Sequence, residues 1–297
     1  MTFTVFTPAF NRKSFLTPIY QSLLSQKNRD FEWLIVDDGS EDDTATTVQE
    51  LINRKEIDIQ YYNKENGGKH TAINLGVQKA KGNLFVIVDS DDVLVNNALE
   101  LLHEQWVAIK DDQAIGGIVG LSSYKTGEIV GSEFPDKIWD VYFPDIYYKH
   151  HLTGDKSVAF KTTVMKQFPF PEKQGVNFVF EAVVWHEMAK KHKVRCINSV
   201  TQIVEYQQAG LSDSSYKTWY IKGLAFSYFQ LITNNTHPFL KYPKVYVWDY
   251  IYLVLYDLLL EGKYFSQLNN FPEKLLYLLV YPRAYFSYRN MKKLIKN

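Results

Sequence analysis

Residues 84–92 read LFVIVDSDD, and this stretch decides the fold. Its first five residues form an uninterrupted apolar run, which is typical of a strand buried on both faces of a parallel sheet. Three carboxylates, those of Asp89, Asp91 and Asp92, follow immediately. Ligands bind beyond the carboxyl ends of the strands in open parallel sheets. The stretch therefore predicts a buried strand that delivers acidic side chains to the ligand-binding edge of such a sheet.

Short β-rich runs alternate with helical stretches around this motif. We expect four strands, at Phe3–Phe6, Glu32–Val36, Ile57–Tyr62 and Leu84–Val88. We expect helices between and after them, at Ser14–Gln26, Thr44–Asn53, His70–Lys79 and Asn97–Ile109. The alternation predicts an α/β fold, with a mostly parallel central sheet and helices on both of its faces.

The regular alternation stops after about Gly116. A loop-rich segment follows, and then a predicted helix at Glu181–Lys191 and predicted strands at Val194–Ile197 and Gln202–Tyr206. From Tyr216 onward, aromatic residues recur at helical intervals. This pattern predicts an aromatic-rich helical C-terminal region.

Composition excludes some classes of partner and suggests a compartment. The 33 basic residues balance the 33 acidic ones, whereas nucleic-acid-binding domains usually carry a basic surplus. We therefore expect no nucleic-acid partner. Cys196 is the only cysteine, which fits a reducing compartment, and no signal-peptide pattern opens the chain. We expect a cytoplasmic protein, since the longest apolar stretch, residues 251–260, is too short to cross a bilayer.

Polar residues follow each of the first four predicted strands. They are Thr7-Pro8-Ala9-Phe10-Asn11-Arg12, Asp37-Asp38-Gly39-Ser40, Asn66-Gly67-Gly68-Lys69 and Asp89-Ser90-Asp91-Asp92. The crowded carboxylates of the fourth group repel one another unless a cation lies between them. Mg²⁺ or Mn²⁺, bound by one or two carboxylates and by substrate phosphates, meets that need. The alternative is a solvated acidic turn that caps the helix near Asn97.

Local structure alone could also explain the polar groups after the second and third predicted strands. Asp37-Asp38-Gly39-Ser40 contains the Asp-Gly pair that is common in turns, but a carboxylate there could also accept hydrogen bonds from a base or ribose. The two glycines before Lys69 allow close backbone approach to an anion, and Lys69 adds a positive charge.

In order and spacing, these four groups together resemble glycosyltransferase family 2, over roughly residues 1–210. The resemblance implies an inverting enzyme with the A-type nucleotide-diphospho-sugar transferase fold. It places Thr7 and Asp38 in the nucleobase pocket, Asp89 near the ribose and Lys69 near the nucleotide. Asp91 reaches the metal, with Asp92 beside it. The remaining residues that we assign to nucleotide-sugar binding are Pro8, Asp37 and Ser90.

The resemblance also implies a catalytic base at the start of a helix after the loop-rich segment. Family members usually carry an acidic pair there, whereas this chain has the single carboxylate Glu181. Glu181 could take the proton of the acceptor hydroxyl, or it could only cap the helix. The segment Gly154-Asp155-Lys156 resembles one that lies near the acceptor cleft in some bacterial members of the family. Asp155 could bind a sugar hydroxyl or form a salt bridge.

We therefore expect a catalytic domain over residues 1–212, with a nucleotide-binding half (1–115) and an acceptor half (116–212), and a helical region over 213–297. The expected donor is a nucleotide sugar, with UDP as the default carrier, and the expected acceptor is a saccharide or lipid-linked saccharide. A non-catalytic nucleotide-sugar-binding protein is the alternative. A nucleotidyltransferase or a dinucleotide dehydrogenase would need a glycine-rich loop after the first strand, where residues 7–12 contain no glycine.

The helical region invites two interpretations. After Glu273 it has no acidic residue, and its basic residues are interleaved with tyrosines and Phe286. Such a pattern suits peripheral contact with the inner face of the cell membrane. The alternative is a helical subdomain that covers the catalytic core or forms a homodimer.

Overall fold

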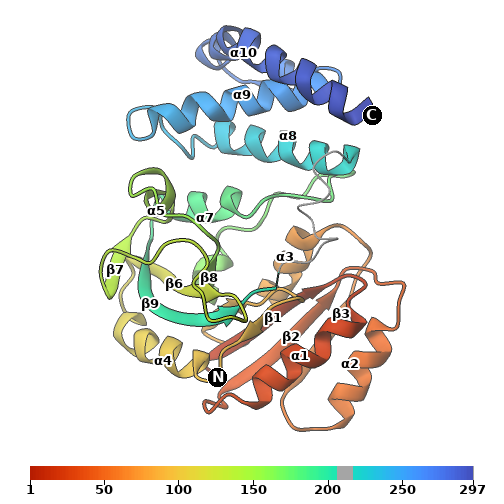
Figure 1. The fold of residues 1–297 in the computed structure, drawn as a ribbon, viewed down its shortest axis with the longest axis vertical. Coiled ribbons are helices and arrows are strands. Elements are labelled where there is room, and N and C mark those ends of the chain that lie inside the picture. The colour runs from red at the N-terminus through yellow and green to blue at the C-terminus, as the bar shows by residue number, and fades with distance from the viewer. Residues whose placement is uncertain (206–216, 297) are drawn as a thin grey trace. The chain divides into compact units, whose positions relative to one another are not determined.

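The computed structural model describes residues 1–205 and 217–296. The chain divides into two compact units, and each is described by itself (Figure 1). The first contains Met1–Pro169 and Met188–Gln207, and the second contains Phe170–Glu187 and Gln208–Asn297. The predicted domain boundary between residues 212 and 213 lies outside the described residues and stays a prediction.

The N-terminal half of the first unit has the predicted alternation of strands and helices. Its elements are β1 (Phe3–Ala9), α1 (Lys13–Leu24), β2 (Phe31–Asp37), α2 (Thr44–Asn53), β3 (Ile59–Asn63), α3 (Lys69–Lys79) and β4 (Leu84–Ile87). The strands lie in the order β3-β2-β1-β4, and all three pairings are parallel. Since parallel strands share one direction, their carboxyl ends meet at one edge of the sheet.

The sheet continues with mixed pairings in the second half of this unit. The elements are β5 (Val93–Leu94), α4 (Ala98–Ile109), β6 (Ile115–Ser123), β7 (Ile138–Val141), α5 (Phe143–Tyr148), β8 (Lys156–Lys161), α6 (Thr162–Met165) and β9 (Lys193–Ile203). The order runs on as β8-β6-β9-β5, with β7 also paired to β9. β8 is antiparallel to β4 and β6, whereas β6 and β9 are parallel. The predicted α/β class is confirmed.

Three predicted elements need correction. The separate strands expected at 194–197 and 202–206 form one strand, β9, because its whole length pairs with β6 despite shifts of register. The helix expected at 181–191 is shorter, since α7 covers Ala182–Met188 and the chain turns into β9 soon afterwards.

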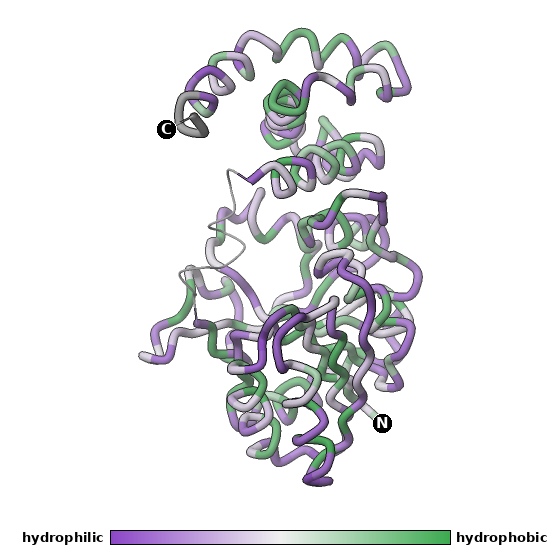
Figure 2. Tube along the Cα trace, turned by 90° about the vertical axis from the view of Figure 1, so that its right-hand side faces the viewer, coloured by the Kyte–Doolittle hydropathy of each residue, from purple (hydrophilic) through white to green (hydrophobic). Residues whose placement is uncertain are grey.

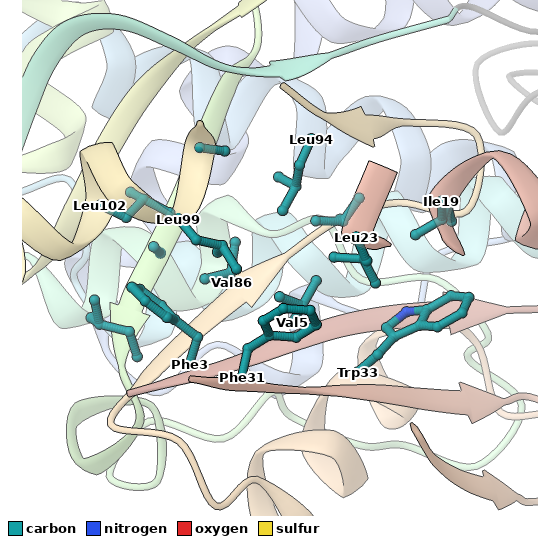
Figure 3. Packing of buried hydrophobic residues seen from close by; sticks show 14 of the residues in the cluster. Phe3, Val5, Ile19, Leu23, Phe31, Trp33, Val86, Leu94, Leu99 and Leu102 are labelled. Atoms are coloured by element: carbon teal, nitrogen blue, oxygen red, sulfur yellow. The ribbon is translucent and has the colours of Figure 1, made fainter. Parts of the chain in front are cut away.

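The core of the first unit lies between the sheet and its helices (Figure 3). Helix α1 buries Leu16, Ile19, Tyr20 and Leu23, which recur at helical spacing on one face. They pack with strand residues such as Trp33, which is fully buried. Burial of a large apolar side chain stabilises a fold by roughly 1.5–3 kcal/mol, so this cluster makes a rigid base for the edge of the sheet.

A buried lysine joins the sheet to helix α4. Lys161, the last residue of β8, is 5% exposed, and its ammonium donates to the carbonyl oxygens of Ile109 and Asp112, each at 2.7 Å. A cation is favourable at a helix C-terminus, where carbonyl groups lack partners within the helix. Burial lowers the pKa of Lys161.

The second unit is helical. It contains α8 (Thr218–Thr233), α9 (Pro243–Leu259), a short 3₁₀ helix η2 (Phe265–Gln267) and α10 (Phe271–Lys296), and α9 packs against both α8 and α10 (Figure 1). His186 Nδ1 lies 2.7 Å from His237 Nε2, and His237 Nδ1 lies 2.7 Å from Asp249 Oδ2. This buried chain of three polar side chains links α7 to α9.

Hydrophobic and hydrophilic residues are interspersed along these helices (Figure 2). Among the described residues, no helix is both long enough and apolar enough to cross a membrane.

Candidate active site

The register of the parallel strands brings the predicted polar groups to one edge of the sheet. Ala9 at the end of β1 is level with Asp37 at the end of β2, and Asp37 is level with Asn63 at the end of β3. Phe6 of β1 is level with Ile87, so the acidic turn after β4 leaves from the same edge. The four groups are therefore neighbours in space, as the sequence predicted.

Asp38 holds the loop that leads into α3. Its carboxylate accepts hydrogen bonds from Lys64 Nζ at 2.6 Å, from the Gly67 N–H at 3.0 Å and from the Gly68 N–H at 2.7 Å. Asp38 is 3% exposed, and such charge-assisted bonds are stronger than neutral ones. Gly68 has a φ of 94°, which favours glycine at this entry to the helix. The Asp38 carboxylate thus fixes the Gly67–Gly68 backbone at the edge of the sheet.

Asp37 at the end of β2 and Thr7 in β1 are both buried. The Asp37 carboxylate accepts from the Ser40 N–H at 2.8 Å and from the Tyr61 hydroxyl at 2.6 Å. Burial, together with the bond to Asp37, raises the pKa of Tyr61. The Thr7 hydroxyl accepts from the Trp33 indole at 3.0 Å. Pro8, between Thr7 and Ala9, is buried in β1.

Two basic side chains cross to the turn after β4. Lys69 Nζ lies 2.7 Å from each carboxylate oxygen of Asp89. Arg12 Nε donates to the Ser90 hydroxyl at 3.0 Å. Asn11, beside Arg12, has a φ of 54°, and its carbonyl side-chain oxygen accepts from the Glu41 N–H at 2.8 Å. The loops after β1 and β2 are therefore tied together, while Arg12 after β1 and Lys69 at the start of α3 bring positive charge to the acidic turn.

Asp91 and Asp92 differ in how they are held. Asp92 accepts from Gln202 Nε2 at 2.6 Å and from the Glu205 N–H at 3.3 Å, both beside the end of β9. Burial and the charges of Asp89 and Asp91 raise the pKa of Asp92 to about 7. Burial, followed by the charge of Asp89, also raises the pKa of Asp91. In the ion-free chain, burial and the neighbouring carboxylates therefore disfavour the charged forms of Asp91 and Asp92.

A small pocket lies beside this turn. It is lined by Phe15, Pro18, Ser90, Asp91, Asp92, Val93, Lys125, Ile203 and Glu205. Asp91 thus faces a space in which a ligand could meet its carboxylate. Lys125 and Glu205, which both line the pocket, form an ion pair of 2.5 Å.

The two remaining predicted residues lie elsewhere along the chain. Asp155 is exposed and directly precedes β8, whose antiparallel pairing with β4 starts β8 at the edge where β4 ends. Glu181 belongs to the second unit, is partly exposed and immediately precedes α7. Its backbone carbonyl accepts from the Trp185 N–H at 3.0 Å, as expected at a helix start.

Comparison with known proteins places this fold and site in a family. The family model of glycosyl transferase family 2 matches residues 4–169, which run from the second residue of β1 past β8 and contain the four polar groups. The chain belongs to glycosyl transferase family 2. The sequence-based identification of this family of transferase enzymes is confirmed.

This chain is similar to a bacterial glycosyltransferase in sequence and to two solved structures in fold. An uncharacterised glycosyltransferase of Rickettsia bellii is 37% identical over 100 residues, which are 33% of this chain and 14% of that protein. The chain thus spans only a small part of this longer relative. Residues 1–349 of Staphylococcus aureus TarS, in complex with UDP-GlcNAc, have a TM-score of 0.61 at 18% identity, covering 94% of this chain and 79% of that one.

The second structure is the mannosyltransferase PcManGT of Pyrobaculum calidifontis in complex with GDP-Man and Mn²⁺. It has a TM-score of 0.55 at 16% identity, and the match covers 99% of this chain and 83% of that one. At these identities the two structures bear on the fold alone, and both agree with the predicted A-type architecture.

The acidic turn of this family 2 chain suits a divalent ion that is shared with a diphosphate. Within residues 1–205 and 217–296, no three His, Cys, Asp or Glu side chains converge as ligands for an ion. A site of one or two carboxylates completed by phosphate oxygens is typical of Mg²⁺. The raised pKa values of Asp91 and Asp92 fit that donor set, because a bound cation would favour their charged forms.

Several residues that shape the site were not found from the sequence. Lys64 bonds to Asp38 and Tyr61 to Asp37 at the end of β2, and Gln202 bonds to Asp92. Arg12 belongs to the polar group after β1, but its contact with Ser90 does not follow from the sequence pattern. A polar residue within or beside a predicted strand is a possible signal for a site residue. The local sequence, however, does not show which carboxylate such a residue contacts.

Proposed function

We propose that this chain is an inverting glycosyltransferase that moves a sugar from a nucleotide diphosphate to a saccharide or lipid-linked saccharide acceptor. UDP is the expected carrier. The observation that carries the proposal is the crowded, partly buried turn Asp89–Asp92, with the basic side chains of Lys69 and Arg12 beside it. The UDP-GlcNAc of the TarS structure and the GDP-Man and Mn²⁺ of the PcManGT structure support this choice of ligands.

Different residues at this edge of the sheet would hold different parts of the donor. Asp38 would present the Gly67–Gly68 backbone to the nucleotide, and Lys69 would exchange part of its contact with Asp89 for the diphosphate. Asp91, with Asp92 behind it, would hold Mn²⁺ or Mg²⁺. When bound, this ion supplies Lewis-acid stabilisation of the charge that develops on the leaving diphosphate.

The contacts of Asp37 and Thr7 suggest an indirect part in binding. Both Asp37 oxygens and the Thr7 hydroxyl already accept hydrogen bonds from the protein. We propose that these residues, with Pro8, shape the floor of the nucleotide pocket. Asp155, exposed at the same sheet edge, is proposed to contact the acceptor.

Glu181 is proposed to take the proton from the acceptor hydroxyl as it attacks the anomeric carbon. A Glu181→Gln variant should bind donor as the native protein does, and its transfer rate should fall by about 10²–10⁴-fold. The exposed Glu172, on the same unit, provides a matched control in Glu172→Gln. Unchanged transfer by Glu181→Gln would leave Glu181 with the capping role alone.

A thermal-shift screen of nucleotide sugars, with and without Mn²⁺, tests the donor class. A ligand that binds only the folded chain at 100 times its Kd stabilises it by about 2.7 kcal/mol. We expect the melting temperature to rise with one nucleotide sugar and to rise further with Mn²⁺. Absence of a shift with every donor would contradict the proposal. A donor-dependent shift without transfer to any acceptor would favour the non-catalytic binding protein.

A further inference from the structure

We propose that the outer face of helix α10 binds the surface of an anionic lipid bilayer. This inference concerns the second unit and does not depend on the donor site. One face of α10 packs on α9 through Tyr277, Val280 and Ala284, which are buried. The Tyr277 hydroxyl donates to Asp257 Oδ2 at 2.6 Å, which fixes the rotation of α10 on α9.

The opposite face of α10 is apolar and exposed. Its side chains recur at helical spacing over about four turns, and we call them the outer face. They are Phe271, Leu275, Leu278, Leu279, Tyr285 and Phe286. Phe271 is 75% exposed, Leu279 67% and Phe286 63%. A contiguous apolar surface of this kind marks an interaction site, whereas single exposed apolar residues need no explanation.

Basic residues flank the outer face. Glu273 is the last acidic residue of the chain, and from Lys274 onward α10 carries only cations among its charged side chains. Arg283, Arg289 and Lys292 are exposed. Arg283 also lies over the Trp248 ring of α9, 5.8 Å from its centroid, and Trp248 is 43% exposed. Long basic side chains can bury their stems beside an apolar surface and keep their charges in a polar layer.

The apolar face and its basic flanks together favour an anionic bilayer surface as the binding partner of α10. Amphipathic helices with this pattern lie in the plane of the interface, and each nearby Lys or Arg contributes to attraction by anionic lipids. A second copy of the chain is less well matched. Two α10 helices would face each other with their cations, and beyond Glu273 neither offers a carboxylate to pair with them.

Vesicle co-sedimentation of the full chain tests the proposal, with no donor or acceptor present. We expect binding to vesicles of phosphatidylcholine mixed with phosphatidylglycerol, and much weaker binding to phosphatidylcholine alone. Arg289→Gln combined with Lys292→Gln should weaken binding about 25-fold, at about fivefold per basic residue. A matched pair of exposed lysines in the first unit, Lys110→Gln with Lys166→Gln, should leave binding unchanged.

A second pair of variants tests the apolar face. Leu278→Gln combined with Leu279→Gln should abolish binding to anionic vesicles, whereas Val107→Gln, which changes an apolar side chain 55% exposed on α4, should not. These side chains are exposed, so circular dichroism should show native helix content and melting. The variants keep the packed face of α10, and substitutions at such surfaces usually change stability by less than about 0.5 kcal/mol.

Two results would overturn the proposal. One is equal binding of the native chain and both α10 variants to anionic vesicles, or no binding by any of them. The other is a native dimer in light scattering that Leu278→Gln with Leu279→Gln converts to a monomer, since the outer face would then belong to a second copy. Because donor binding is measured separately, either result leaves the proposed transferase function untouched.

Discussion

The raised pKa of Asp92 predicts that ion binding at the acidic turn depends steeply on pH. In the ion-free chain, burial and the charges of Asp89 and Asp91 place this pKa at about 7. A carboxylate must lose its proton before it can hold a cation, so protons compete with Mn²⁺. With a pKa of about 7, roughly a tenth of the Asp92 side chains are ionised at pH 6 and roughly nine tenths at pH 8.

The affinity for Mn²⁺ should therefore rise about tenfold between pH 6 and pH 8. We propose to measure free Mn²⁺ by electron paramagnetic resonance during titrations in saturating UDP. The Asp92→Asn variant keeps an oxygen that can accept from Gln202, but it has no proton to lose in this range. It should bind Mn²⁺ more weakly than the native chain, with the rise between pH 6 and pH 8 greatly reduced.

Two controls make the comparison decisive. Titration of the UDP diphosphate is common to both proteins and cancels in the ratio of their affinities. An exposed carboxylate of the same unit, changed in Asp136→Asn, should leave the tenfold rise intact. Identical pH dependence in the native chain and in Asp92→Asn would refute the reasoning, because the raised pKa would then have no part in ion binding.

The same pKa has a consequence for stability, and its sign is opposite to that of an ordinary ion-paired aspartate. The folded-state pKa of Asp92 lies above the ordinary aspartate value of about 3.9, so the folded chain binds more protons than the unfolded one between about pH 4 and pH 7. The contribution of Asp92 to the stability of the ion-free chain is therefore lost as pH rises through this window. Bound Mn²⁺ should restore that stability above pH 7.

Three further predictions concern other parts of the chain. Lys161→Met should lower the free energy of unfolding in urea by about 1–3 kcal/mol, since buried carbonyls lose their donor, and the exposed Lys166→Met should not. Asp38→Asn should release the Gly67–Gly68 loop and so weaken UDP binding, measured by calorimetry, by about 10–100-fold. An unchanged Kd would contradict the role of Asp38 in holding this loop for the nucleotide. Burial and then His237 hold the pKa of His186 well below its usual value, so the contribution of His186 to the stability of the second unit should fall by about 1.4 kcal/mol per pH unit below about pH 6.5. The native chain and His186→Asn should therefore differ less in urea midpoint at pH 5 than at pH 7, and a difference that is the same at both pH values would contradict this.

Local patterns in the sequence predicted the elements whose character is decided locally. The apolar run of β4 and the helical spacing of α1 identify buried elements without knowledge of their partners. Helix α2 has the predicted bounds, Thr44–Asn53. The four polar groups were expected at one edge because the strands were expected to be parallel, and the registers of β1 to β4 confirm that arrangement.

Features that depend on distant pairing could not be predicted. The polar residues near Ser199 interrupt the apolar pattern of β9, and pairing with β6 overrides the interruption. Strand β8 lies in the segment that the sequence predicts to be loop-rich, because its pairing with β4 and β6 is not visible locally. The bond from Gln202 to Asp92 joins residues 110 positions apart, so it exists only once the sheet has formed.

The central claim, that the turn after β4 holds a divalent ion shared with a diphosphate, is tested most directly by anomalous diffraction from crystals of the chain with UDP and Mn²⁺. We predict an anomalous peak within coordination distance of an Asp91 carboxylate oxygen and of the diphosphate, and its loss in Asp91→Asn crystals grown in the same way. A diphosphate bound beside Lys69 with no manganese at Asp91, or a manganese peak that persists in Asp91→Asn, would contradict the claim.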